Sequence, residues 1–142
     1  MIIDANLLLY AHDELSPRHD RAKDWLEEVL SGDEPVGLPL VTLLAFLRIG
    51  TNSSAFPNPL TTEEAISVVT TWLSLPNVRV PEPTELHWST LEEICRVGQA
   101  RGPVLMDAHV AALALEHGAT LCTSDRDFTR FPRLKVHDPL AA

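Results

Sequence analysis

Three short, largely apolar runs of this chain each end at an aspartate, and burying them restricts the possible folds. The runs occupy residues 1–3, 104–106 and 121–124, and the aspartates that follow them are Asp4, Asp107 and Asp125. A carboxylate beside a buried segment is costly unless its charge is paired or bound. If the runs are parallel strands, their carboxyl ends share one sheet edge, where open α/β folds bind ligands. Three carboxylates that meet there would favour a hard divalent cation. The alternative, that each aspartate only caps a helix or begins a turn, explains one aspartate more easily than all three.

Composition limits the class of protein. The 142 residues are 45% hydrophobic, which predicts one compact domain over residues 1–142. The chain carries 11 Lys and Arg against 20 Asp and Glu, a net charge of −9, which excludes a protein that binds nucleic acid through a broadly basic surface. A polyanionic substrate must therefore meet a local basic patch, a bound metal or a partner. No leader-like segment or long apolar run is present, so a cytoplasmic protein without membrane association is expected. Cys95 and Cys122 lack metal-site spacing and are expected to be buried thiols in a reducing compartment.

Strand and helix patterns alternate along the chain, which is typical of βαβ units. The expected fold is α/β, with a small, mostly parallel central sheet flanked by helices. Strands are expected at residues 1–3, 36–38, 78–80, 119–123 and 135–137. Helices are expected after Asp4, from Ser16-Pro17 to Gly32, over 41–49 and 61–73, from near Thr84 to Gly102 and from Asp107 to Gly118, with a short helical turn at 125–131. Thr61 and Glu64 match a capping box at the start of one helix.

Several of these segments resemble a known family. Asp4-Ala5-Asn6, residues 107–114 and residues 123–128 are similar to the signatures of PIN domains, and more closely to the VapC toxins of bacterial VapBC toxin–antitoxin pairs. The likeness extends from Asp4 to Pro139, and residues 42–52 are typical of one VapC branch. The resemblance implies a dimeric ribonuclease that depends on Mg²⁺ or Mn²⁺, acts on structured RNA of the tRNA or rRNA class and is inhibited by a cognate VapB antitoxin.

One position departs from the family pattern. Many PIN domains carry a Glu where this chain has Ala45. Either one metal position is weakened or that Glu is dispensable in this branch. The first possibility leaves an alternative function open, a catalytically weak PIN fold that acts mainly as an antitoxin-binding and regulatory partner. Other acidic α/β folds fit less well, because Asn6 stands where a haloacid-dehalogenase phosphatase needs a second acid and no glycine-rich phosphate loop is present.

The three aspartates receive the main catalytic roles in this interpretation. Asp4 and Asp107 are expected to bind the first Mg²⁺ directly or through water, with Mn²⁺ as a possible substitute. Asp125 would complete the cluster and either orient the attacking water or hold a second ion. A metal held with open coordination positions can activate water and neutralise phosphoryl charge.

Supporting roles are expected for residues around these aspartates, with structural alternatives for each. Asn6, Thr123, Ser124 and Asp127 would contact ligands or substrate or simply form turns, and Asp127 is expected to point away if its turn is helical. His109, on a different helical face from Asp107, would contact substrate or be a partly buried histidine. Arg48 would pair with an acid near the site, contact RNA or extend into solvent. The other five histidines are expected at the surface.

Two surfaces are candidates for partners. A dense basic run follows Asp125 and consists of Arg126, Arg130, Arg133 and Lys135, which would either contact RNA phosphates or form a solvated face. The apolar helices around residues 41–49 and 65–73 are candidates for a homodimer or antitoxin interface. The acidic net charge suits an antitoxin that brings Arg or Lys to the carboxylates and displaces the metal.

Overall fold

The computed structural model describes residues 1–141, and its centre is a five-stranded sheet. The strands are β1 (Ile2–Ile3), β2 (Val36–Gly37), β3 (Val78–Arg79), β4 (Leu121–Cys122) and β5 (Val136–His137), in the order β3-β2-β1-β4-β5. Every neighbouring pair is parallel, so the sheet is wholly rather than mostly parallel. The predicted α/β class is confirmed. All five strands therefore end at the same edge of the sheet.

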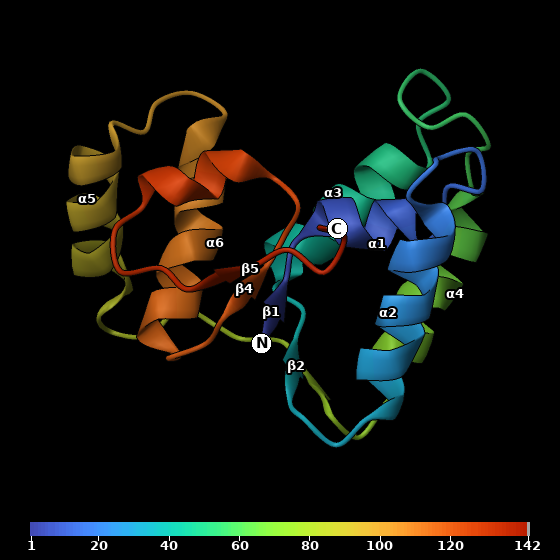
Figure 1. Ribbon diagram of the computed structural model, residues 1–142, viewed down its shortest axis with the longest axis horizontal. Helices are drawn as coiled ribbons and strands as arrows, with labels where there is room; N and C mark the ends of the chain where they lie inside the picture. The colour runs from blue at the N-terminus through green and yellow to red at the C-terminus, as the bar shows by residue number, and fades with distance from the viewer. Residues whose placement is uncertain (142) are drawn as a thin grey trace.

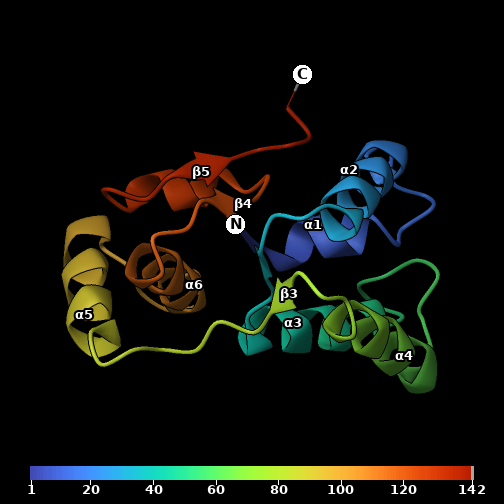
Figure 2. The same ribbon diagram turned by 90° about the horizontal axis from the view of Figure 1, so that it is seen from below.

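Six helices and one 3₁₀-helix surround this sheet. They are α1 (Ala5–Tyr10), α2 (His19–Ser31), α3 (Leu40–Gly50), α4 (Thr62–Leu73), α5 (His87–Gly98), α6 (Val104–Glu116) and the 3₁₀-helix η1 (Arg126–Arg130). Figures 1 and 2 both place α5 and α6 at one end of the molecule and α2 and α4 at the other, with the short strands between them. Among the residues that the structure describes, no helix has the length and apolar character needed to cross a membrane.

The core has two parts because side chains alternate along β1. Ile2 packs in one cluster with Leu121 and the alanine-rich face of α6, whereas Ile3 packs in a second cluster with residues of α1 and α3 such as Leu7 and Phe46. The strand order reverses direction at β1, since the chain next adds β2 and β3 on one side and later β4 and β5 on the other. Open α/β sheets bind ligands beyond the strand ends at such a point, here the ends of β1 and β4.

Three expected helix starts are displaced, and that of α6 lies at Val104 instead of Asp107. The helix predicted from Ser16-Pro17 begins at His19, because the Ser16 hydroxyl accepts a hydrogen bond from the Arg18 amide (3.1 Å) in a preceding turn. The helix predicted from near Thr84 begins at His87. In contrast, the capping box is confirmed: Thr61 Oγ1 accepts from the Glu64 amide and Glu64 Oε1 accepts from the Thr61 amide, both at 3.1 Å.

The run before Asp107 is not a strand. Residues 104–106 form the first turn of α6, so Asp107 reaches the sheet edge from a helix that begins there. The condition that all three runs are strands, from which a shared sheet edge was inferred, therefore does not hold for the run before Asp107. Only Asp4 and Asp125 come after strands, β1 and β4 respectively.

Candidate metal centre

Asp4 is held at the end of β1 by two hydrogen bonds. It is the N-cap of α1, and its Oδ1 accepts from the Ala5 amide at 2.8 Å. Its Oδ2 accepts from the Thr123 hydroxyl at 2.7 Å, across the junction between β1 and β4. One carboxylate oxygen is thus oriented by the first amide of α1 and the other by Thr123, just after β4.

Thr123 connects Asp4 to two further groups. Its side chain is 1% exposed, and its Oγ1 accepts from the Asp125 amide (3.0 Å) and from the Asn6 Nδ2 (3.4 Å). Because the hydroxyl proton is donated to Asp4, Asn6 must present its NH₂ group to Thr123. This leaves the Asn6 Oδ1 buried, and residues 1–141 provide no hydrogen-bond partner for it.

Three more aspartates lie near Asp4, close enough that the charge of Asp4 raises the pKa of Asp107. One carboxylate oxygen from each of Asp107, Asp125 and Asp127 lies within 4.8 Å of the other two, and Asp4 does not belong to this group of three. Asp125 caps η1, with its Oδ1 accepting from the Asp127 amide at 2.9 Å. The expectation that Asp127 points away is therefore wrong. We call Asp4, Asp107, Asp125 and Asp127 the carboxylate cluster.

Charge repulsion and burial change the acidity of the cluster. The pKa of Asp107 is raised to about 6, chiefly because burial penalises the charged form. The charges of the other three aspartates add to this increase, and that of Arg130 opposes it. Burial also raises the pKa of Asp4, although the hydrogen bonds from Thr123 and Ala5 partly offset this effect. The cluster is therefore a poor place for several bare negative charges.

The donor set suits a hard divalent cation. Carboxylate oxygens gather at one half-buried point, and the unpartnered Asn6 Oδ1 adds a buried acceptor that a water molecule of a hydrated ion would satisfy. Mg²⁺ needs only one or two carboxylates and retains several waters. The residues present therefore fit such an ion. When a second carboxylate of the cluster ionises, the bound cation rather than a proton would neutralise its charge.

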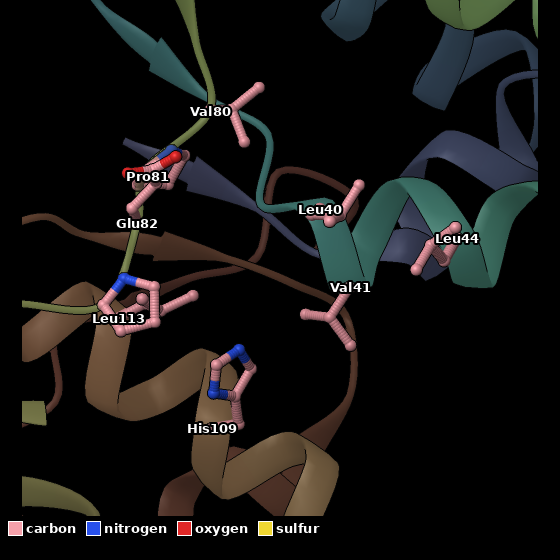
Figure 3. Close-up of a pocket in the computed structure, with 9 residues that line it drawn as sticks. Leu40, Val41, Leu44, Val80, Pro81, Glu82, His109 and Leu113 are labelled. Atoms are coloured by element: carbon pink, nitrogen blue, oxygen red, sulfur yellow. The ribbon is translucent and has the colours of Figure 1, made fainter. Parts of the chain in front are cut away.

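His109 is not brought to the cluster. It lines a cavity of about 500 Å³ with apolar residues of α3 and the segment after β3, including Val41 and Val80 (Figure 3). Its Nδ1 lies 3.0 Å from the Nε2 of His87, whose Nδ1 contacts the Glu116 carboxylate. His87 was expected at the surface, and this prediction is wrong. The sequence shows no spacing signal for this contact, because 29 positions separate His87 from Glu116.

Other predicted residues take varied positions. Arg48 is exposed on α3, and no ion pair to it occurs within residues 1–141, so the expected partner acid is absent from that range. Ser124 and Ala45 are half-buried. His12 is not at the surface either, since it packs edge-on against Phe46 and Trp72.

The basic run divides in the structure. All four residues, Arg126, Arg130, Arg133 and Lys135, are exposed. Arg133 forms an ion pair with Glu93 at 3.1 Å. Arg130 instead lines a cavity with Arg101 and Gln99, two residues that the sequence analysis did not select. Their separation of about thirty positions from η1 gives no pattern that would have found them.

Comparisons with known proteins identify the family. The family model for the PIN domain matches residues 1–134. Ribonuclease VapC37 of Mycobacterium tuberculosis is 40% identical over 140 residues, which cover 99% of this chain and 97% of that protein. Ribonuclease VapC33 of the same organism is 38% identical over 141 residues, covering 99% and 98% respectively.

Solved structures share the fold. VapBC2 from Rickettsia felis, bound to a DNA fragment from its promoter, has a TM-score of 0.68 at 21% identity and covers 96% of both chains. M. tuberculosis VapC20, described as a sarcin-ricin loop cleaving toxin, has a TM-score of 0.66 at 19% identity, with 94% of this chain and 98% of that chain covered. The full-length match to the PIN domain and to curated VapC proteins establishes that this chain belongs to the PIN-domain family, among the VapC ribonucleases.

Proposed function

We propose that this chain is the toxin of a type II toxin–antitoxin pair, an Mg²⁺-dependent endoribonuclease that hydrolyses structured RNA of the tRNA or rRNA class. The observation that carries the proposal is the carboxylate cluster at the switch point of the sheet, where Asp107, Asp125 and Asp127 approach within 4.8 Å of one another. Mn²⁺ is expected to substitute for Mg²⁺, since both accept oxygen ligands.

Each residue has a distinct task in this proposal. Asp4 and Asp107 would hold the ion, which when bound supplies an activated water and neutralises charge on the phosphoryl oxygens. Asp125 orients the attacking water and accepts its proton. Thr123 keeps Asp4 oriented through the 2.7 Å hydrogen bond to the Asp4 Oδ2. The Ala5 amide holds the Asp4 Oδ1 in the same way. Water adds to phosphorus and gives its proton to Asp125, while the bond from phosphorus to the leaving ribose oxygen breaks and that oxygen takes a proton from solvent.

Relatives support the partner and the substrate class. VapC20, with the same fold, is described as cleaving the sarcin-ricin loop, which is a structured RNA. The Rickettsia felis neighbour is a VapBC complex, so a VapB-type antitoxin is proposed as the inhibitor, with basic side chains that compete for the cluster. A homodimer and a cytoplasmic location complete the proposal.

The alternative, a catalytically weak PIN fold that serves mainly as an antitoxin partner, rests on Ala45. The structure offers a reason to prefer the nuclease. Asp127 lies with Asp107 and Asp125 in a group of three carboxylates, and the charge of Asp4 also acts on Asp107, even though position 45 has no acid. The loss of a Glu at position 45 therefore does not leave the centre short of acidic ligands.

RNA cleavage by the purified chain tests the proposal. Structured RNA should be cut at discrete positions in Mg²⁺ and remain intact in EDTA. Asp107→Asn should lower the rate at least about 100-fold, because it removes a ligand and its charge. Asp24→Asn, which removes an exposed charge on α2, is the matched control and should cleave normally. Equal cleavage in EDTA, or by Asp107→Asn, would contradict the metal mechanism, and an inactive but folded wild type would favour the alternative.

A further inference from the structure

We propose that Arg101 and Arg130 form a binding site for an RNA backbone phosphate next to the carboxylate cluster. This inference rests on the proposed nuclease function and deepens it, because it places part of the substrate strand. The site would position the phosphate that neighbours the one to be cleaved, and neither arginine would take part in the chemical step.

The site is a cavity between three elements. Its volume is about 730 Å³, and it is lined by residues from the end of α5, the start of α6 and the end of η1, namely Gly98, Gln99, Arg101, Val104 and Arg130. Gly98 makes the close packing of this region possible, because a Cβ at this position would lie 3.0 Å from the Phe131 ring and 3.3 Å from the Arg130 carbonyl oxygen. The two arginines, far apart in sequence, therefore face one shared space.

The two guanidinium groups are available for a ligand. Neither side chain forms an ion pair or a hydrogen bond with any residue between 1 and 141, and both residues are exposed. Two nearby arginines differ in this respect, since Arg133 is paired with Glu93 at 3.1 Å and Arg96 with Glu92 at 3.9 Å. Arg126 and Lys135 also lack an ion pair within residues 1–141, but they do not line this cavity. In a chain of net charge −9, two unpaired arginines that line one cavity are a local exception.

The chemistry of the cavity suits a phosphate group. Guanidinium groups bind phosphate oxygens through two parallel hydrogen bonds, and two of them can hold one phosphate from both sides. The cavity also includes Val104, the first residue of the 13-residue helix α6, whose amino end carries partial positive charge.

The position of the cavity connects it to the proposed chemistry. Val104 precedes Asp107 by less than one turn of α6, and Arg130 belongs to the same 3₁₀-helix as Asp127. The charge of Arg130 acts on Asp107, which shows that the cavity and the cluster are electrostatic neighbours. A strand whose scissile phosphate lies at the cluster would therefore extend its next phosphates towards Arg130 and Arg101.

RNA binding without cleavage tests this site. Asp107→Asn serves as the host, and its affinity for a fluorescent hairpin RNA is measured in Mg²⁺ over a salt series, with a gel to confirm intact RNA. Adding Arg101→Ala or Arg130→Ala should weaken binding about tenfold and reduce the slope of log K against log salt by about 0.7 to 1. Arg96→Ala removes the same charge from the neighbouring helix end outside the cavity and should change neither quantity.

Two further measurements separate the possible results. In the active protein, Arg101→Ala should raise KM more than it lowers kcat, and Arg101→Lys should recover the salt slope but only part of the affinity, because lysine keeps the charge without the planar fork. Effects of Arg101→Ala and Arg130→Ala no larger than those of Arg96→Ala would overturn the site. The arginine variants could show the expected loss of affinity and salt slope while the wild type fails to cleave RNA in Mg²⁺. In that case the nuclease proposal fails and the phosphate site stands.

Discussion

Thr123 connects both strand ends of the carboxylate cluster through a single hydroxyl. It donates to Asp4 and accepts from the Asp125 amide and from Asn6, and its side chain is almost completely buried. A hydroxyl in this position stabilises the charged form of Asp4, whose pKa burial otherwise raises. Its removal would take one hydrogen bond each from three half-buried groups, the Asp4 Oδ2, the Asp125 amide and the Asn6 Nδ2.

Replacement of this hydroxyl should affect both stability and cleavage. Thr123→Val keeps the side-chain shape but removes the hydrogen bonds, so we expect a loss of about 1 to 3 kcal/mol in the free energy of unfolding. Cleavage should fall about 10- to 100-fold, because Asp4 loses its orienting contact. Urea unfolding and initial cleavage rates measure the two effects. Thr123→Ser retains the hydroxyl and should recover most of both, and a valine variant that behaves like wild type would show that the hydroxyl is unimportant.

For single residues, the sequence was a better guide to which aspartates lie together than to the direction of their side chains. Asp4 and Asp125 could be recognised because each follows a strand pattern. The geometry of Asp127 could not, since the prediction assumed that Asp125 lies inside the helical turn. Asp125 instead has an extended conformation (φ −87°, ψ 117°) as the N-cap, which turns its side chain towards that of Asp127. The catalytic roles of these residues remain predictions.

Gly98 fixes the approach of η1 to α5. A Gly→Ala change in a helix interior ordinarily gains about 1 kcal/mol, and Gly98, as the last residue of α5, would gain less than that. Here, however, the added Cβ would lie 3.0 to 3.1 Å from the buried Phe131 ring. We expect the clash to dominate and to lower the free energy of unfolding by about 1 to 3 kcal/mol.

A second glycine provides the control for this prediction. A Cβ at Gly32, just after α2, would meet only ordinary contacts at 3.5 and 3.6 Å, and its φ is −85°. Gly32→Ala should therefore change stability by less than about 0.5 kcal/mol. Thermal and urea unfolding of both variants give the comparison, and a Gly98→Ala protein more stable than wild type would contradict the packing interpretation.

Elements with strong local signals were predicted, and those with ambiguous signals were not. The capping box of α4 specifies its start through Thr61 and Glu64 alone. The apolar run 104–106 carries no such information, because a short buried strand and the start of an apolar helix have the same composition. α6 is buried over most of its surface, so its sequence shows no polar face that would distinguish the two.

The fold class of the whole molecule can be predicted from the alternation of helix and strand patterns, but the order of the strands in the sheet cannot. Alternating helix and strand patterns predicted a parallel sheet, since parallel strands need crossover connections. Nothing in the sequence states that β4 returns to the far side of β1, although this return creates the switch point where the carboxylate cluster forms. The contact between His87 and Glu116 and the cavity of Arg101 and Arg130 are likewise products of the complete fold, in which α5 packs against α6.

Proton and metal binding should compete at the cluster, with consequences for the stability of the entire domain. The pKa of Asp107 is about 6 in the folded chain, against 3.8 for an unperturbed aspartate, so folding favours its protonated form. Its contribution to stability is therefore greatest at low pH and is lost as the pH rises through about 6. Because this carboxyl is half-exposed and solvent screens its neighbours, we expect a loss of about 1 kcal/mol between pH 5 and pH 7.5 in EDTA.

Comparison with Asp107→Asn isolates the effect of Asp107 and its repulsion within the cluster, because titrating groups outside the carboxylate cluster contribute equally to both proteins. His12 and His109 have pKa values lowered by burial, so their contributions fall at low pH, opposite to that of Asp107. In EDTA, raising the pH from 5 to 7.5 should destabilise the wild type by about 1 kcal/mol more than the variant. At millimolar Mg²⁺ the wild type should gain about 3 °C in melting temperature at pH 7.5 and less at pH 5, where protons occupy the site. Identical pH profiles for the two proteins would mean that the Asp107 carboxylate does not destabilise the fold at pH 7.5. An equal Mg²⁺ gain in Asp107→Asn would mean that the cluster does not bind the metal through Asp107.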